Sequence, residues 1–320
     1  MSRVDRPPQR SAARATPAAL RWRRFSGRWP RHAQARTRSL HDPAPFQREM
    51  PDFVESLLPF AKHPGYQDAG EASRTELLTC AWLIYNAKQI ELERSVVMPA
   101  CLDLLGGTLP GAETSEARLV VAEALTDEGF HILMLDHASE AARRRRGLSV
   151  KTIPACYAVE RLSAELALPA EPWERRLLVF AAAVVSEVFI CSYLRQIASS
   201  QTIQPMHAGI THAHLQDELG HGSIFRALVR DGYQVMSRRE KACFIDALPK
   251  AVAWFDTQDV APWHSVLDQL EFPARRELIN DCFDAAPAMV DFTPLFKLCD
   301  ELQIVGIRDR ALEHCAQEAR

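Results

Sequence analysis

Two short strings of acid and histidine are the first candidates for chemistry in this chain of 320 residues. Glu128 and His131 are separated by two residues, and Glu218 and His221 repeat the same Glu-x-x-His spacing. On a helix, side chains three positions apart lie on one face, so both can reach a single metal ion. Each string also lies in a stripe of aliphatic residues. We interpret both as metal-ligand pairs, although a lone core histidine more often has only a structural hydrogen bond.

A third imidazole strengthens this interpretation. His214 precedes Glu218 by four residues, so the second string extends to His-x-x-x-Glu-x-x-His on one helical face. His212 is the alternative imidazole nearby, with a hydrogen bond as the simpler role for either. Three potential ligands on one stripe favour a metal site.

Glu187 is the only charged residue in the eighteen-residue stretch LLVFAAAVVSEVFICSYL. The length would suit a membrane span, but a carboxylate near its middle makes insertion costly, and we see no second candidate span. We therefore predict a buried helix of a soluble protein, with no membrane association. A buried ionised carboxylate costs several kcal/mol unless it is paired, so Glu187 needs a metal, a basic residue or a proton as partner.

The earliest of the long apolar helices offers two acids, Glu91 and Glu93. Glu93 shares its helical face with Trp82, Asn86 and Ile90, whereas Glu91 falls on a more polar face. The apolar stripe favours Glu93 as the inward-facing acid, and Glu91 is kept as the alternative.

In chain order, four helices present Glu, Glu-x-x-His, Glu and Glu-x-x-His. This is the arrangement of carboxylate-bridged dinuclear iron or manganese sites in four-helix bundles. Mixed carboxylate and imidazole ligands suit Fe(II), and two anionic bridges offset the charge of two adjacent cations. Zinc is disfavoured, because we find no Cys or His-Glu-x-x-His string placed to bind it.

The elements that must position these residues all have a helical period, and we find no convincing alternating strand. Ser73–Glu76 and Ser237–Glu240 have the pattern of capping boxes. Arg143–Arg146 lie at the negative end of a helix that Gly147 would cap, which favours a structural role over nucleic-acid binding. The fold class is therefore predicted to be all-α, with helices near 76–101, 114–146, 154–168, 172–199, 204–231, 237–248, 261–270, 273–285 and 294–317.

Charge divides the chain into two unlike parts. Residues 1–50 contain twelve Arg, no Lys and three acids, so their net charge is +9, whereas the remainder has a net charge of −12. We predict that residues 1–49 are a disordered basic tail, or that the true start is Met50, and that residues 50–320 are a single domain. A binding tail and a targeting segment are the alternatives.

Composition excludes several other classes of protein. The chain is 47% hydrophobic and 25% charged, which is ordinary for a globular protein. It contains neither of the common glycine-rich phosphate-binding strings. The eight Cys never approach C-x-x-C spacing, so we expect free thiols in a reducing cytoplasm rather than disulfides or a zinc ribbon.

The string from Tyr85-Asn86 to Glu93-Arg94-Ser95-Val96-Val97-Met98-Pro99, followed by the later acids and histidines, resembles the p-aminobenzoate N-oxygenase family. The resemblance covers about residues 70–230, and the histidine before the second Glu-x-x-His is its distinctive mark. It implies a ferritin-like helical bundle with additional C-terminal helices. The ligands that it implies for two iron ions are Glu93, Glu128, His131, Glu187, His214, Glu218 and His221.

The resemblance also implies a reaction. We expect O₂-dependent oxidation of an aryl or aliphatic amine, free or carrier-bound, to a hydroxylamine, nitroso or nitro product in secondary metabolism. An external electron-donating reductase would be needed, and a homodimer is compatible with this expectation. Two alternatives remain: a diiron oxidase acting on carbon or generating a radical, with Tyr157 and Tyr193 as candidate radical sites, and a non-enzymatic ferritin-like iron-binding protein.

Overall fold

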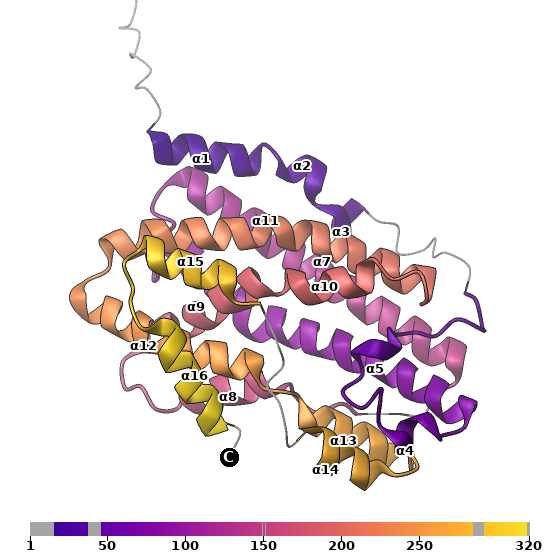
Figure 1. Cartoon of the computed structure of the whole chain (residues 1–320). Helices are drawn as coiled ribbons and strands as arrows, with labels where there is room; N and C mark the ends of the chain where they lie inside the picture. The colour runs from indigo at the N-terminus through magenta and orange to yellow at the C-terminus, as the bar shows by residue number, and fades with distance from the viewer. Residues whose placement is uncertain (1–15, 38–45, 149, 151, 284–290, 319–320) are drawn as a thin grey trace, which may run out of the picture.

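The computed structural model contains helices and no strand in the residues that it describes, which are 16–37, 46–148, 150, 152–283 and 291–318 (Figure 1). The prediction of an all-α fold is confirmed. Four long helices form the centre of the molecule: α5 (Glu71–Leu92), α7 (Ser115–Arg146), α9 (Pro172–Phe189) and α11 (Pro205–Val235). Helix α5 packs on α7, and α7 and α9 each pack on α11.

The ends of α7 follow the predicted capping chemistry. The Thr114 side chain accepts a hydrogen bond from the backbone N–H of Ala117 at 3.1 Å. Gly147 ends the helix in the left-handed conformation, with φ at 66°, where a side chain would be strained. The four arginines of the last turn lie at the negative end of the helix dipole.

Helix α9 is the most deeply buried part of the bundle. Every residue of 177–189 is buried, including Glu187. Residues Pro172–Ala198 include a stretch apolar enough to cross a membrane, but 83% of that stretch is buried inside the protein. A core helix accounts for this apolar run, as the sequence predicts.

Two of the predicted helices are interrupted close to the candidate ligands. The helix expected over 76–101 contains a π-helical segment, η2 (Glu93–Val97), before it continues as α6 (Met98–Leu105). The helix expected over 172–199 breaks after Phe189 and resumes as α10 (Cys191–Ala198). At this break the Ser192 hydroxyl donates to the Phe189 carbonyl at 3.1 Å, an alternative to regular helical bonding.

Other helix boundaries also differ from the predictions. Helix α5 begins at Glu71 with Gly70 as its N-cap, so the Ser73 capping box is wrong, whereas the Ser237–Glu240 box is present. Helix α11 continues past Gly232, whose missing side chain lets the Pro110 carbonyl approach. The other helices after residue 50 in the described part of the chain are η1 (Glu55–Leu57), α4 (Pro64–Gln67), α8 (Tyr157–Glu165), α12 (Arg238–Asp256), α13 (Val260–Gln269), α14 (Arg275–Phe283), α15 (Thr293–Glu301) and α16 (Ile307–Glu318).

The described part of the basic N-terminal segment is folded, in contrast to the predicted disordered tail. Residues 17–37 form α1 (Pro17–Ser26), α2 (Trp29–His32) and α3 (Gln34–Thr37), which lie along α7 and α11 (Figure 1). Trp22 is buried, and Arg21 and Arg23 form ion pairs with acids of α11 and α7. Ion pairs and buried apolar side chains therefore join the segment to α7 and α11. Residues 1–15 and 38–45 lie outside the described part of the chain.

Candidate metal centre

The structure brings together all seven acids and histidines that the sequence analysis proposed as ligands. They come from η2, α7, α9 and α11, and each is at most 3% exposed to solvent. Their potential ligand atoms form two groups of four residues, within each of which these atoms lie within 4.8 Å of one another. The first group is Glu93, His131, His214 and Glu218, and the second is Glu128, Glu187, Glu218 and His221.

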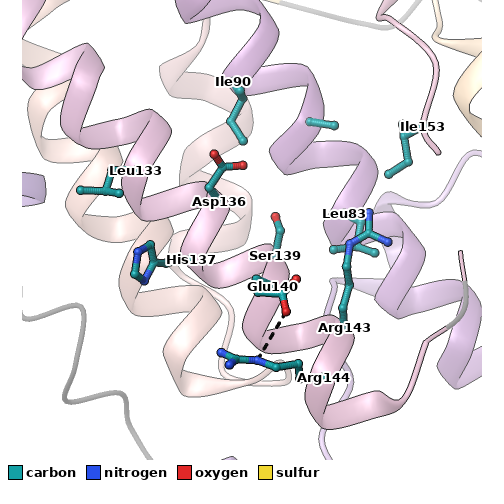
Figure 2. Close-up of a pocket in the computed structure, with 11 residues that line it drawn as sticks. Leu83, Ile90, Leu133, Asp136, His137, Ser139, Glu140, Arg143, Arg144 and Ile153 are labelled. Carbon is teal, nitrogen blue, oxygen red and sulfur yellow. Dashed lines mark ion pairs between the residues drawn. The ribbon is translucent and has the colours of Figure 1, made fainter. Parts of the chain in front are cut away.

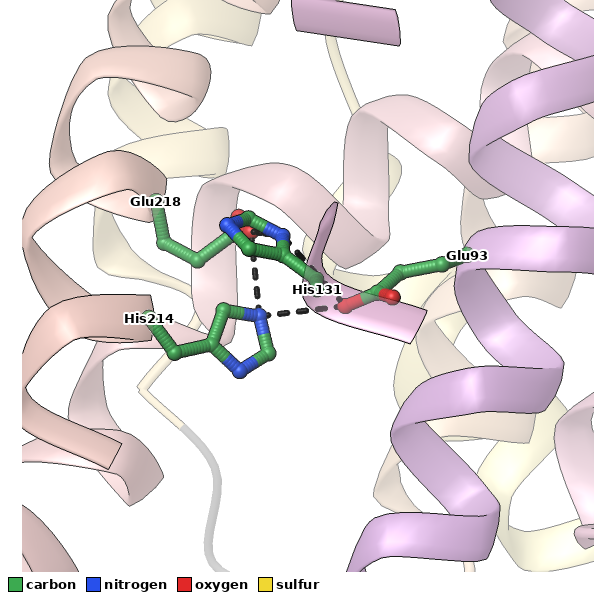
Figure 3. Close-up of side chains that lie close together, drawn as sticks. All are labelled: Glu93, His131, His214 and Glu218. Atoms are coloured by element: carbon green, nitrogen blue, oxygen red, sulfur yellow. Dashed lines mark ion pairs between the residues drawn. The ribbon is translucent and has the colours of Figure 1, made fainter. Parts of the chain in front are cut away.

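In the first group, the two histidines lie close to the carboxylate oxygens of the two glutamates (Figure 3). His214 Nε2 lies 3.1 Å from Glu93 Oε1 and 3.2 Å from Glu218 Oε1. His131 Nδ1 lies 3.6 Å and 3.3 Å from the same two atoms. One nitrogen of each imidazole and one oxygen of each carboxylate therefore face a common point.

The second group shares a carboxylate with the first. His221 Nδ1 lies 3.5 Å from Glu218 Oε1 and 3.7 Å from Glu187 Oε2. Glu128 also lies between the groups: its Oε1 is 3.0 Å from His221 Nδ1, and its Oε2 is 3.1 Å from His131 Nδ1. Glu218 thus belongs to both groups, and Glu128 directs one oxygen toward a histidine of each.

The π-helical segment places one of the two acids of the first helix, Glu93, in the cluster. Glu93 begins η2 and is 3% exposed, with its carboxylate in the first group. Glu91 lies outside both groups, and its Oε2 accepts a hydrogen bond from the backbone N–H of Cys156 at 2.8 Å. Short π-helical turns inside α-helices are frequent at functional sites, because they redirect side chains.

A glycine allows α9 and α11 to approach each other beside the cluster. A side-chain Cβ at Gly222 would lie 2.7 Å from the carbonyl oxygen of Glu187, which is closer than real Cβ contacts. Gly222 lies one residue after His221, so this close approach brings the Glu187 side chain within reach of His221. The glycine therefore has a packing role at the site.

Two aspartates that the sequence analysis missed lie behind the histidines. His131 Nε2 is 3.2 Å from Asp217 Oδ2, and His221 Nε2 is 3.3 Å from Asp127 Oδ2. Each aspartate directly precedes the glutamate of one Glu-x-x-His string and contacts the histidine of the other, which links α7 to α11. The sequence does contain a signal for these two aspartates, because the pattern Asp-Glu-x-x-His occurs twice. Carboxylates behind ligating histidines fix the ring orientation and tautomer.

The electrostatics of the cluster favour the binding of cations. Burial, together with the Glu218 and Glu128 carboxylates, raises the pKa of Glu187 well above its usual range. Burial lowers the pKa of His221, but the Glu128 and Glu218 carboxylates outweigh this and raise it well above its usual range. Protons therefore bind here in the absence of another cation.

Several polar atoms of the cluster are buried without a hydrogen bond, although such atoms are rare in folded proteins. Among the described residues they include Glu93 Oε2, Glu187 Oε2 and Glu218 Oε2. A carboxylate oxygen that lacks a hydrogen-bond donor in a buried, electron-rich site fits coordination to a metal ion.

A cavity of about 310 Å³ lies beside the cluster. Its lining includes Gln89 and Leu92, which lie just before Glu93, and Phe189 and Ile190, which lie just after Glu187. Tyr193, one of the two proposed radical sites, also lines it. The other, Tyr157, donates a hydrogen bond to Glu318 and does not line this cavity.

A larger groove of about 770 Å³ lies between α5 and α7 (Figure 2). Its walls carry Asp136 and Glu140 as well as Arg143 and Arg144, and Glu140 pairs with Arg144 at 3.6 Å. None of the seven candidate ligands lines either space, but the smaller cavity is lined by Leu92, which directly precedes Glu93, and by several aromatic side chains. The cavity beside Gln89 is therefore the better candidate for a substrate site.

Comparison with known proteins confirms the resemblance seen in the motifs. Residues 23–302 match the p-aminobenzoate N-oxygenase AurF family. A 4-aminobenzoate N-oxygenase from Streptomyces thioluteus is 31% identical over 280 residues, which cover 86% of this chain and 83% of that protein. The family match begins at residue 23, inside the basic segment.

Proposed function

The chain belongs to the p-aminobenzoate N-oxygenase family and is an arylamine N-oxygenase, and we propose that its seven buried acids and histidines hold the two iron ions of this reaction. The observation that carries the proposal is the pair of four-residue groups that share Glu218. Such an arrangement suits two metal ions bridged by carboxylates.

We assign the ligands from the distances within the cluster. Glu218 belongs to both groups, and Glu128 directs one oxygen toward each of two histidines. These two carboxylates would bridge the ions. The terminal ligands would be Glu93, His131 and His214 on one ion, and Glu187 and His221 on the other.

Charge balance supports divalent ions. The cluster contains four carboxylates, all buried, and three imidazoles that ligate as neutral groups. Two divalent ions would neutralise the four negative charges, which removes the large cost of burying unpaired anions. Imidazole and carboxylate together suit iron, whereas Ca²⁺ and Mg²⁺ prefer oxygen ligands alone.

When bound, reduced iron supplies the redox chemistry that activates O₂ for transfer of one oxygen atom to nitrogen. Oxidation of an amine to a hydroxylamine by O₂ consumes two electrons and two protons and releases water. An external electron donor is therefore required. The protein's own residues exclude water through the apolar wall of α9 and position the amine.

The cavity beside the cluster suits an aromatic amine. Its wall contains Phe53, Phe189, Phe255 and Trp263, whose faces can pack against an aryl ring. Gln89 lies one helical turn before Glu93, and its buried Oε1 has no hydrogen-bond partner among the residues that the structure describes. We propose that this oxygen accepts an N–H of the amine and directs the nitrogen toward the metal ions.

The charges in the cavity wall bear on the rest of the substrate. The cavity's lining includes one cation, Lys88, whose Nζ lies 2.6 Å from Asp259 Oδ2. Asp259 already neutralises Lys88, so a substrate carboxylate would have to compete with it. We propose that neutral aryl amines, such as esters or amides of 4-aminobenzoate, enter more readily than the free acid that the Streptomyces enzyme is named for.

Product analysis tests the proposal. Iron-loaded, reduced protein would be mixed with O₂ and with 4-aminobenzoate, its methyl ester, aniline or an aliphatic amine, and hydroxylamine, nitroso and nitro products would be measured. We expect turnover of the aryl amines, with the ester ahead of the acid. Asp259→Asn should shift the ratio of ester turnover to acid turnover in favour of the acid. Absence of N-oxygenated product from every amine would contradict the function, and an unchanged ratio would contradict the role of Asp259.

The cellular setting is proposed on chemical grounds. All eight cysteines are free thiols, which fits a reducing cytoplasm that also contains reductases able to donate electrons. A homodimer stays a prediction, which sedimentation of the full chain would test.

A further inference from the structure

Hydrogen-bond donors from the N-terminal segment converge on the two aspartates behind the metal centre. Trp29 Nε1 donates to Asp127 Oδ2 at 2.8 Å. The backbone N–H groups of Gln34 and Ala35 donate to Asp217 Oδ1 at 2.6 Å and Oδ2 at 2.9 Å. We call residues 29–35, which include α2 and the start of α3, the N-terminal arm.

The arm and the histidines share the same carboxylate oxygens. Asp127 Oδ2 accepts from Trp29 and lies 3.3 Å from His221 Nε2. Asp217 Oδ2 accepts from Ala35 and lies 3.2 Å from His131 Nε2. Within the described part of the chain, the hydrogen bonds found to these two carboxylates come only from the arm and the two histidines.

Both aspartates are buried, at 2% and 4% exposed, so their orientation depends on these few partners. A buried carboxylate without donors would rotate toward another partner or admit water, and the imidazole behind it would lose its fixed orientation. Arm residues Ala33 and Ala35 are themselves buried, which keeps water from replacing the arm's donors.

We infer that the N-terminal arm is a positioning element of the metal centre, which holds Asp127 and Asp217 so that they fix His221 and His131 for coordination. The inference rests on the proposed metal site. It assigns a role to a segment far from every ligand in sequence, and it makes the site depend on the arm as well as on the four elements that carry the ligands.

Trp29→Phe is the direct test, because it removes the N–H donor and keeps an aromatic ring beneath Arg36, whose guanidinium lies 4.3 Å from the Trp29 ring. Trp22→Phe is the matched control. Trp22 Nε1 donates to Asp231 Oδ2 at 3.1 Å in the same N-terminal region, and neither residue belongs to the metal cluster.

Full-length, metal-free proteins would be titrated with Co²⁺, which reports coordination through its visible absorption. Loss of the group that hydrogen-bonds a ligating histidine weakens metal binding by about 10- to 100-fold, and Trp29 holds such a group, Asp127, in place. We expect such a loss for Trp29→Phe, with a changed Co²⁺ spectrum, and wild-type affinity and spectrum for Trp22→Phe. Thermal melting of both metal-free variants would show that each is folded.

A double-mutant cycle separates positioning from general stability. Since Trp29 acts through Asp127, adding Trp29→Phe to Asp127→Asn should weaken Co²⁺ binding little further. The positioning role would be overturned if the effects of Trp29→Phe and Asp127→Asn on the Co²⁺ dissociation constant multiplied in the double variant. It would also be overturned if both tryptophan variants lost Co²⁺ affinity equally, or if Trp29→Phe bound Co²⁺ like the wild type. A wild-type protein that binds no metal would overturn the proposed metal site itself.

Discussion

At the scale of single residues, His214 has the most specific place in the cluster. Its Nε2 lies close to oxygens of Glu93 and Glu218, and its Nδ1 is buried without a hydrogen-bond partner. The position of Nε2 fits a ligand of the first group, and His214 differs from His131 and His221 in that no aspartate is found behind its second ring nitrogen among the described residues.

We predict that His214→Ala keeps the fold and much of the iron but loses amine turnover, because one ion gains a position open to water. His212, exposed on the same helix, provides the control, and His212→Ala should keep full turnover. Product formation and iron content would be measured in both. Wild-type turnover by His214→Ala would remove this residue from the ligand set.

His207 predicts a pH dependence of stability that is independent of the metal ligands. It is buried and stacked on Trp82 with a ring separation of 4.1 Å, and burial lowers the pKa of His207 to about 4. The unfolded chain binds a proton at this residue near pH 6.5, but the native state resists doing so until about pH 4. Stability is therefore lost as the pH falls through this interval.

The expected size follows from the two pKa values. Between pH 7.5 and pH 5 the wild-type protein should lose about 2 kcal/mol more unfolding free energy than His207→Gln, which cannot take up this proton. Urea unfolding of both proteins at the two pH values measures the difference. Equal losses of unfolding free energy in the two proteins would show that His207 is not kept neutral in the native state.

At the scale of elements, the contact between α9 and α11 at Gly222 positions Glu187. Gly222→Ala would place a Cβ 2.7 Å from the Glu187 carbonyl oxygen, and a backbone atom cannot move aside cheaply. We expect a loss of about 1–3 kcal/mol in unfolding free energy, as for overpacking in general, and weaker metal binding.

Gly220→Ala is the control for this substitution. Gly220 lies on the same helix, and a Cβ there would meet nothing within 4 Å. Replacing an exposed helical glycine by alanine stabilises a protein by about 0.5–1 kcal/mol. Denaturant unfolding and metal titration of both variants test the contact. If Gly222→Ala were as stable as Gly220→Ala, the close packing of α9 on α11 would be wrong.

The elements also show how far the sequence could predict the structure. Helical periodicity and capping residues located most of the helices, because apolar spacing reports directly on a buried face. The π-helical turn at Glu93 was not predictable, since it depends on packing rather than on propensity. The aspartates behind the histidines could have been found, because Asp127 and Asp217 precede the two glutamates in the same pattern.

At the scale of the whole molecule, the contrast in charge between the N-terminal segment and the rest was misinterpreted. Composition favours an independent tail, but Arg21 pairs with Asp231 and Arg23 with Glu116. Single surface ion pairs contribute little, so most of the stabilisation comes from the burial of apolar residues of the segment, which include Trp22, Ala33 and Ala35. Net charge alone does not report such contacts.

The central claim, two iron ions bridged by Glu218, is tested most directly by metal analysis after anaerobic Fe(II) loading of the full chain. We predict about two iron ions per chain for the wild type and for Glu91→Ala, about one for Glu93→Ala, and almost none for Glu218→Ala, because only Glu218 belongs to both groups. One metal ion per wild-type chain, preferential zinc binding with full activity, or equal losses in Glu93→Ala and Glu218→Ala would contradict the account.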